Sequence, residues 1–501
     1  MGSSNMTASF NFFDRLEVAD LDWVLNLGGE REFAPGSRLL MEGQAVDSLF
    51  VVMHGLLATY VDPELETTID RFGPGEIIGV LSFFDGRASS STVAAKENST
   101  VIEIPFGAIE ERTESDPGFG SRIYRTLGER MAQRCRALEE LTETGDQPES
   151  GGPEAAAWQQ IQAALEGFKR LFSASDTSAR RAGGIVTQQL SETVRAAYKE
   201  FARRAQDILR ESSGLAESVR NRLGSRLRQE LLPFLSMSEN AERWHSKPRG
   251  YAGDYLAIQR IYENQEKGSG TMGPALDRCF LEVSAARAVR NRRELLRQQI
   301  RDTVEANPSR SSRITSLACG PARELFDVFS EIEDAERLDA TLIDHDLQAL
   351  SFVSDKADAA GLRGRMRFLN ENLVFLGTGR RSIDLAPQDL IYSAGVIDYF
   401  RDRFVVRMLN FIYDSLRPGG RVVLGNFHPS NPDRPFLDHI VEWRLIHRDE
   451  EDMRRIVSES KFAEGTVDVV FENEGVNLFL VAERQLEDVE TPEDSAIEVT
   501  A

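Results

Sequence analysis

The chain has 501 residues, 41% of them hydrophobic, and its formal net charge at pH 7 is −22. This length gives a prior of about three domains, and the apolar content suffices to bury several cores, which excludes global disorder. The negative charge disfavours nucleic-acid binding as a main function, because binding to phosphate backbones needs a concentrated positive field.

The sequence also constrains cellular location and bound metals. No apolar run reaches the ~18 residues that a membrane span requires, and the N-terminus lacks a signal-peptide pattern. The three cysteines (Cys135, Cys279 and Cys319) are far apart and odd in number, which argues against a disulfide framework or a zinc site. We therefore expect a cytoplasmic protein that holds no metal.

Residues 10–141 predict a β-rich domain that ends in a long helix. Short β-prone runs are separated by Gly and Pro at intervals of about 8 to 12 residues, the spacing of a small antiparallel barrel or jelly roll. Residues 119–141 then carry apolar side chains at steps of three and four, which predicts one helix. Strands are expected at residues 48–53, 56–61, 91–94 and 101–104.

Two further domains are predicted after this one. Residues 142–154 are polar and rich in helix breakers, as in a linker. The apolar stripe of residues 155–304 predicts a helical lid or substrate domain, and the alternation of strands and helices in residues 310–484 predicts a parallel α/β sheet. The acidic residues 485–501 are expected to form a disordered tail. The predicted fold class is therefore multidomain, with α+β and α/β parts.

The α/β segment has a glycine and an acid at the ends of its first two expected strands. Gly320 follows a strand and precedes a helix, where the missing side chain lets a ligand approach the backbone amides. Asp344 ends the next strand, and an acid there can bind both hydroxyls of a ribose. These features predict a ribose-containing cofactor. Further strands are expected at residues 366–369, 389–395 and 421–426, with a closing pair at 466–471 and 477–483.

This succession resembles the class I S-adenosylmethionine-dependent methyltransferases, whose Rossmann-like sheet has seven strands. The Leu-Arg-Pro-Gly-Gly turn at residues 416–420 and the closing strand pair carry the resemblance, although the glycine loop at residues 317–322 is leaner than is usual. A Rossmann domain that is cofactor-free or binds a dinucleotide is the alternative, and the lack of a third glycine disfavours NAD. The resemblance implies S-adenosylmethionine as the cofactor, with Ala318, Cys319 and Gly320 at its methionine part, Asp344 and His345 at the ribose, Asn372 at the adenine and Ser393 beneath the sulfonium.

Methyl transfer is an in-line displacement from a cationic sulfur, so positioning does most of the work. A base is needed only when the acceptor atom is protonated at neutral pH. Candidates for catalytic residues are Asp398 and Tyr399 after the fourth strand and His428 after the fifth. Each has a structural alternative, because Asp398 can cap a helix, Tyr399 can pack, and His428 can sit in a proline-rich loop.

Residues 244–255 mix aromatic, charged and glycine residues, which is poor helix material. We interpret them as an ordered, function-bearing loop, with a structured surface turn as the alternative. In such a lid, Arg249 and Tyr251 would grip a carboxylate of the cofactor or substrate, and Arg323 is a further candidate cation. The six arginines of residues 286–301 are interpreted mostly as a solvated helix face.

The N-terminal segment resembles the cyclic nucleotide-binding domain of catabolite activator proteins, with the closest matches at residues 33–43, 49–55 and 72–79. That family binds the ribose with a glutamate and the cyclic phosphate with an arginine. Here Val80 and Ser89 stand at those positions, and each lost contact costs about 2 kcal/mol or more. We therefore expect no physiological cyclic-nucleotide binding, unless Arg87 compensates.

The long helix of this domain is expected to form a homodimer seam, as it does in relatives. Its apolar stripe is wider than one small barrel needs and consists of Ile123, Leu127, Met131 and Leu138. No helix-turn-helix pattern follows, which argues against a transcription factor.

The segment at residues 248–255, joined to residues 316–324, resembles bacterial methyltransferases associated with methyl esters of 3-hydroxy fatty acids, a quorum signal. This resemblance implies transfer to a fatty carboxylate, which is already deprotonated at pH 7 and needs no base. The alternatives are a small-molecule N- or O-methyltransferase and a non-catalytic protein that senses S-adenosylmethionine or a lipid.

Overall fold

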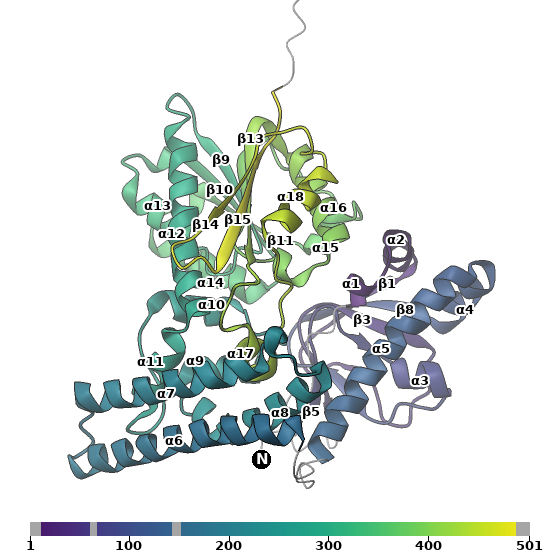
Figure 1. The fold of residues 1–501 in the computed structure, drawn as a ribbon. Coiled ribbons are helices and arrows are strands. Elements are labelled where there is room, and N and C mark those ends of the chain that lie inside the picture. The colour runs from purple at the N-terminus through teal and green to yellow at the C-terminus, as the bar shows by residue number, and fades with distance from the viewer. Residues whose placement is uncertain (1–11, 61–67, 143–151, 487–501) are drawn as a thin grey trace, which may run out of the picture.

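A computed structural model describes residues 12–60, 68–142 and 152–486. Figure 1 shows three parts that meet near the centre of the molecule: an N-terminal β-roll, a layer of long helices and a C-terminal α/β domain. The multidomain fold class predicted from the sequence is confirmed. The expected linker and acidic tail lie largely outside the described residues.

The N-terminal domain is a roll of two antiparallel four-stranded sheets, with strand orders β1-β8-β3-β6 and β2-β7-β4-β5. The expected strands correspond to β3, β4, β7 and β8, and the expected long helix is α5. The other four strands are short and were not predicted. The elements are α1 (Phe12–Arg15), α2 (Val18–Leu27), β1 (Gly29–Phe33), β2 (Arg38–Leu40), β3 (Ser48–His54), β4 (Leu57–Tyr60), β5 (Thr68–Phe72), β6 (Ile77–Ile78), α3 (Val80–Asp85), β7 (Thr92–Ala95), β8 (Ser99–Pro105), α4 (Phe106–Ser115) and α5 (Pro117–Thr142).

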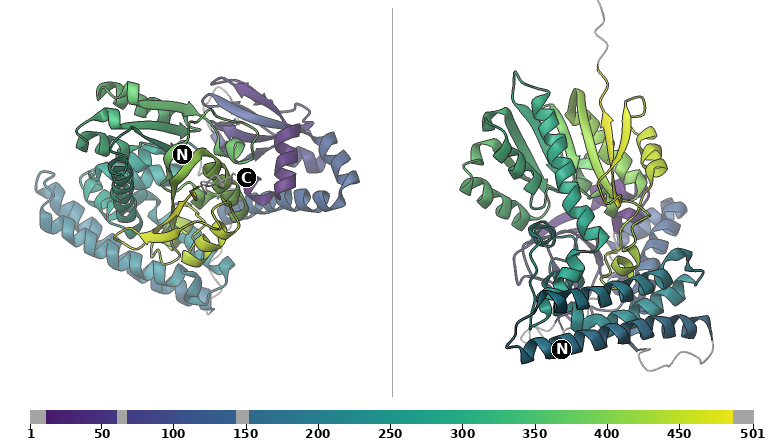
Figure 2. Two further views of the ribbon diagram at one scale, coloured as in Figure 1. Left: turned by 90° about the horizontal axis from the view of Figure 1, so that it is seen from above. Right: turned by 60° about the vertical axis from the view of Figure 1, so that its left-hand side comes forward.

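The middle of the chain is helical, as predicted, and the long helices α6 and α7 lie side by side beneath the C-terminal domain in Figure 1 and in the right-hand view of Figure 2. Their apolar stripes pack into a common core with the loop after the fifth strand of the C-terminal domain. No helix of the described residues is long and apolar enough to cross a membrane. The helices are α6 (Pro153–Arg181), α7 (Gln188–Leu209), α8 (Glu217–Leu235), α9 (Glu239–Ser246), α10 (Tyr255–Glu263), α11 (Gly273–Leu281) and α12 (Ser284–Glu305).

The C-terminal domain holds the predicted seven-stranded sheet, in the order β11-β10-β9-β12-β13-β15-β14. The first five strands are parallel, whereas β15 runs antiparallel to both β13 and β14, as the expected closing pair requires. The strands are β9 (Ser312–Leu317), β10 (Leu338–Asp344), β11 (Met366–Asn370), β12 (Gln388–Ser393), β13 (Leu416–Phe427), β14 (Val467–Phe471) and β15 (Asn477–Glu483). The helices are α13 (Arg323–Glu331), α14 (Leu347–Ala359), α15 (Leu373–Gly377), α16 (Asp402–Ser415), α17 (Arg434–His439) and α18 (Glu450–Ser458).

One boundary differs from the prediction. The residues expected as a turn before the fifth strand belong to β13, whose pairing with β12 shifts between Leu416 and Arg421. Gly419 adopts φ +75°, and a Cβ on Gly420 would lie 2.8 Å from the Gln388 carbonyl oxygen. The two glycines therefore permit a bulge inside a strand that pattern alone predicts to begin later.

A single apolar core joins the N-terminal and C-terminal domains. It includes Phe12 and Ile123 from the N-terminal domain and Leu373 and Phe404 from the C-terminal one. Ile123 and Leu127, two members of the expected dimer stripe, are fully buried in this core within one chain. The homodimer stays a prediction. Ile123 and Leu127 are already buried by residues of the same chain, so a partner chain is not needed to cover them.

Candidate active site

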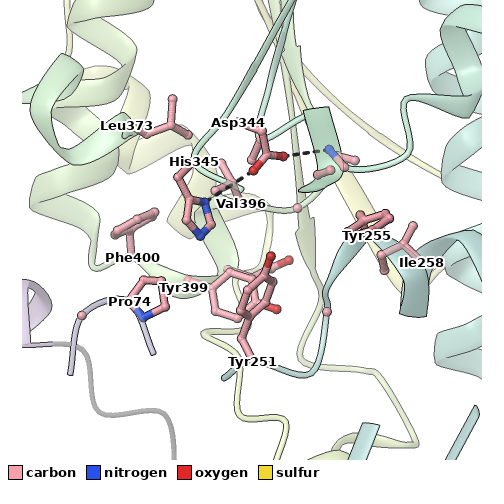
Figure 3. Close-up of a pocket in the computed structure, with 18 of the residues that line it drawn as sticks. Pro74, Tyr251, Tyr255, Ile258, Asp344, His345, Leu373, Val396, Tyr399 and Phe400 are labelled. Atoms are coloured by element: carbon pink, nitrogen blue, oxygen red, sulfur yellow. Dashed lines mark hydrogen bonds and ion pairs between the residues drawn. The ribbon is translucent and has the colours of Figure 1, made fainter. Parts of the chain in front are cut away.

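A cavity of about 500 Å³ opens at the carboxyl ends of the parallel strands, where ligands bind in open α/β sheets. Residues 318–320 follow β9, Asp344 ends β10, and residues 394–396 follow β12, and all of these line the cavity. The lid segment contributes Tyr251, and the N-terminal domain contributes a third wall. The cavity therefore lies where all three parts of the molecule meet (Figure 3).

Asp344 is held by backbone amides on two sides. One carboxylate oxygen accepts a hydrogen bond from the Gly320 amide at 3.0 Å, and the other accepts from the Asp346 amide at 2.9 Å. The side chain is buried, and burial raises its pKa despite the neighbouring His345. Gly320 has φ +52° with open space at its Cβ position, so the loop leaves room beside its amide for a ligand.

The predicted cofactor residues Ala318, Cys319, Gly320, Asp344, His345 and Asn372 all line this cavity. Ser393 does not line it; its side chain is buried, and its Oγ has no hydrogen-bond partner among the described residues. The Cys319 thiol is buried as well, which raises its pKa well above the usual value. The strand order and the resemblance together thus predicted which residues meet, and six of the seven expected cofactor residues line the cavity.

His345 and Asn372 both contact the N-terminal domain, which the sequence did not predict. The His345 ring lies 3.5 Å from the Asp344 carboxylate and 6.2 Å, centroid to centroid, from the ring of His54. The Asn372 side chain donates to the Met53 carbonyl oxygen at 2.9 Å and accepts from the Val374 amide at 2.8 Å, capping α15. Its expected hydrogen bond to adenine stays a prediction.

Two of the three predicted substrate-binding residues lie elsewhere. Arg249 makes a two-pronged ion pair with Asp346, at 2.6 and 2.7 Å, and does not line the cavity. Arg323 is partly exposed beside Asp327 and does not line it either. Protein carboxylates already face both arginines, and the expectation that they grip a ligand carboxylate stays a prediction. Tyr251 does line the cavity.

The three catalytic candidates separate in the same way. Asp398 and Tyr399 line the cavity, whereas His428 lies outside it, paired with Glu450 at 3.3 Å. Asp398 accepts a hydrogen bond from the Phe427 amide at 2.8 Å, and burial raises its pKa to about 7. The Tyr399 hydroxyl accepts from the indole of Trp443 at 2.9 Å, and burial raises its pKa, so it stays protonated at neutral pH.

Arg292 is the cavity cation that sequence reasoning missed. It lies on α12, is 7% exposed and lines the cavity, and its Nε has no hydrogen-bond partner among the described residues. One of its terminal nitrogens and an Asp398 oxygen both lie 3.0 Å from the Cβ position of Gly395. The helical spacing of the sequence could have placed Arg292 inside, because it lies four and eight residues before Leu296 and Ile300 on the buried face of α12.

Two further arginines, Arg401 and Arg444, line the cavity and are exposed to solvent. No ion pair to either of them, or to Arg292, is found within 4.0 Å among the described residues. The lining also holds five acidic residues, so its charge is mixed, and the two exposed arginines can attract an anionic ligand locally. The five are Glu76, Glu324, Asp344, Glu371 and Asp398. Among the described residues, no cluster of His, Cys, Asp and Glu could hold a metal ion.

The pocket expected for a cyclic nucleotide is a separate, small cavity of about 60 Å³ in the N-terminal domain. Val80 and Ser89 line it, where the related family has its glutamate and arginine. Arg87, the possible substitute, is exposed beside Asp85 and does not line it. Arg130 does line it, but pairs with the buried Glu76 at 3.3 Å.

Two protein-family models match the chain. The model "Cyclic nucleotide-binding domain" matches residues 30–116, and the model "Putative methyltransferase" matches residues 249–468. The chain therefore carries one region similar to cyclic nucleotide-binding domains and, after it, one region similar to methyltransferases. The second match begins at Arg249 and includes Asp344, Asp398 and Arg292.

Curated relatives and solved structures resemble parts of the chain. The neuropathy target esterase of Drosophila virilis is 33% identical over 120 residues, which are 22% of this chain and 8% of the esterase. A possible exported protein of Bordetella parapertussis is 18% identical over 59% of this chain and 97% of its own, with TM-score 0.43. Magnesium protoporphyrin IX methyltransferase of Synechocystis, solved with bound S-adenosylhomocysteine, is 11% identical over 49% and 97%, with TM-score 0.34. With TM-scores of 0.43 and 0.34, these two solved structures support no conclusion about the function of this chain.

Proposed function

We propose that the protein is an S-adenosylmethionine-dependent methyltransferase that esterifies the carboxylate of an acid with an apolar tail, such as a 3-hydroxy fatty acid. The methyltransferase domain and the buried Asp344 at the end of β10 support the cofactor. The cofactor would supply a methyl group on a cationic sulfur. Asp344 would hold the ribose hydroxyls, because its carboxylate is fixed by two backbone amides before any ligand arrives.

The observation that carries the acceptor class is the buried Arg292. Arg292 makes no ion pair within 4.0 Å among the described residues, although the carboxyl groups of Asp398 and Glu324 lie near enough to act on it. Burying a guanidinium without an ion pair is costly, so the site favours a ligand that brings a carboxylate. Cofactor and acid acceptor each bring one, and Arg401 and Arg444 at the opening offer further positive charge. A carboxylate attacks without a base, which agrees with a cavity whose only histidine among the described lining residues, His345, faces Asp344.

Apolar side chains offer a wall for the tail of such an acid. Ile258 on α10 and Trp443, Leu445 and Ile446 in the loop after α17 line the same cavity. Burying a chain of methylene groups there contributes about 0.8 kcal/mol for each. The acceptor is then oriented by charge at one end and bound by apolar contact along its length.

The experiment compares Arg292→Met with Arg293→Met, a matched control on the same helix whose arginine pairs with Asp327. Methylation of a fatty acid series is measured, and S-adenosylhomocysteine affinity is determined separately by calorimetry. We expect Arg292→Met to raise the KM for the acid about tenfold or more at unchanged cofactor affinity, since charged hydrogen bonds contribute about 1.5–3 kcal/mol. A loss confined to cofactor affinity would instead assign Arg292 to the cofactor's carboxylate.

The proposed acceptor class would be contradicted by a screen in which amines or phenols are methylated while fatty acids are inert. One observation favours this second candidate, a small-molecule N- or O-methyltransferase. Asp398 lies in the cavity with a pKa near 7, which suits a general base for a hydroxyl or ammonium acceptor.

A further inference from the structure

The N-terminal domain supplies one wall of the active cavity. Phe13, the end of β3 at Val52 and Met53, and the turn at residues 74–76 line it. In Figure 3, Pro74 projects from the N-terminal domain on the side of the view where Phe400 and Leu373 lie. The region similar to cyclic nucleotide-binding domains thus lines a cavity whose expected cofactor residues lie in the methyltransferase-like region.

This wall contacts the residues expected at the adenosine end of the cofactor. The Asn372 side chain donates to the Met53 carbonyl oxygen at 2.9 Å. His54 packs edge-to-face on His345, which itself lies beside Asp344. The N-terminal domain therefore reaches the expected ribose and adenine positions through both backbone and side-chain contacts.

Resting on the proposed function, we propose that the N-terminal domain is part of the cofactor site: it covers the adenosine end, so docking of this domain and cofactor binding stabilise each other. Because the wall and the cofactor residues touch, a ligand between them contacts both domains at once. Conditions that move the N-terminal domain away would lower cofactor affinity, which gives this domain control over the methyltransferase.

The docked arrangement is held by contacts outside the cavity as well as by the shared apolar core. Arg407 on α16 makes a two-pronged ion pair with Asp22 on α2, at 2.9 Å to each oxygen. Arg249 bridges Glu97 of the N-terminal domain, at 3.2 Å, and Asp346 of the C-terminal domain. Arg249 thus serves the domain contact rather than the cavity.

The backbones of the two parts approach each other closely at two glycines, one in each part. A Cβ on Gly73, in the turn after β5, would lie 3.2 Å from the Cα of Gly250 in the lid. A Cβ on Gly250 would lie 2.9 Å from the Cα of Gly73, so neither position has room for a side chain. A valine at position 73 is therefore a wedge that separates the N-terminal domain from the lid.

The test uses the full chain and S-adenosylhomocysteine as the probe, measured by calorimetry without turnover. We expect Gly73→Val to weaken binding about tenfold or more, whereas the control Gly107→Val, whose Cβ position is open, has no effect. Asp22→Arg and Arg407→Asp, which lie outside the cavity, are each expected to weaken binding by about two- to fivefold, and the double swap to restore it.

Hydrogen exchange on the same samples separates the outcomes. We expect the probe to protect the amides of residues 52–54, 73, 75 and 76 together with those of residues 318–320. Protection of the glycine loop without protection of the N-terminal wall, or wild-type affinity in Gly73→Val, would overturn the inference and leave the proposed function standing. A wild-type chain that does not bind the probe would overturn both.

Discussion

The side-chain amide of Asn372 in the methyltransferase domain donates a hydrogen bond to the backbone carbonyl of Met53 in the N-terminal domain, at 2.9 Å. Asn372 follows β11, at the end of the sheet where the adenine is expected, and Met53 lies near the end of β3. The two domains are therefore joined at the cavity itself, and the predictions below concern both sides of this contact.

The first prediction concerns the ribose acid. Asp344→Ala removes a carboxylate whose hydrogen bonds to ribose hydroxyls contribute about 1.5–3 kcal/mol. Affinity for S-adenosylmethionine should fall by about ten- to hundredfold. Calorimetry on the folded variant checks this, with Asp334→Ala, at a short surface helix away from the cavity, as the control. Unchanged affinity in Asp344→Ala would exclude Asp344 as the ribose ligand.

The second prediction uses the pKa of Asp398, which burial raises to about 7. Below pH 7 this group is neutral, and above pH 7 its charge repels an acid acceptor. The KM for a fatty acid should therefore rise as the pH increases through 7, and this rise should be absent in Asp398→Asn. A wild-type kcat that instead increases through pH 7, and no longer does so in the variant, would show that Asp398 acts as a base.

The same group predicts how stability depends on pH. The pKa of Asp398 is higher in the folded chain than in the unfolded one, so the folded state holds the extra proton between about pH 4 and 7. Its contribution to stability is fully present below about pH 4 and is lost as the pH rises from there through 7. Unfolding by denaturant at pH 5 and pH 8 should show Asp398→Asn gaining stability relative to the wild type at the higher pH. An equal difference at both pH values would contradict the assigned shift.

The third prediction concerns the binding of cyclic nucleotides. Val80 and Ser89 line the small cavity of the N-terminal domain without the charges that the related family uses, so cyclic AMP should not bind at micromolar concentration. Calorimetry on the full chain checks this. The double variant Val80→Glu and Ser89→Arg is the informative comparison, since gained binding would support the assigned positions. Micromolar binding by the natural sequence would show that residues other than those at positions 80 and 89 bind the cyclic nucleotide.

The fourth prediction is the homodimer through α5. Because Ile123 and Leu127 are buried within one chain, the seam must use exposed positions of that helix, such as Tyr124, which is 41% exposed. Tyr124→Glu should convert a dimer to a monomer in sedimentation experiments. Tyr124→Ala, which removes the same ring contacts with Phe83 and Phe84 but adds no charge, separates this effect from lost packing. A wild-type chain that sediments as a monomer would contradict the prediction.

Strand order and the expected cofactor residues were predictable because parallel strands bring their carboxyl ends to one edge. Asp344 and Gly320 were found from that rule alone. Long-range pairing was not predictable: nothing in the sequence near Arg249 shows that Asp346, 97 residues later, neutralises it. The many arginines of residues 286–301 indicate a solvated helix face, but the helical spacing of Arg292 puts it on the buried side of α12. The wall formed by Met53 depends on how two domains pack, which local patterns do not encode.

A crystal structure with S-adenosylhomocysteine and a 3-hydroxy fatty acid tests the central claim most directly. We predict the ribose hydroxyls on Asp344, the N-terminal wall closed over the adenosine and the acid's carboxylate beside a cavity arginine. Density for the nucleoside away from Asp344, or for the acid outside the cavity, would contradict the account.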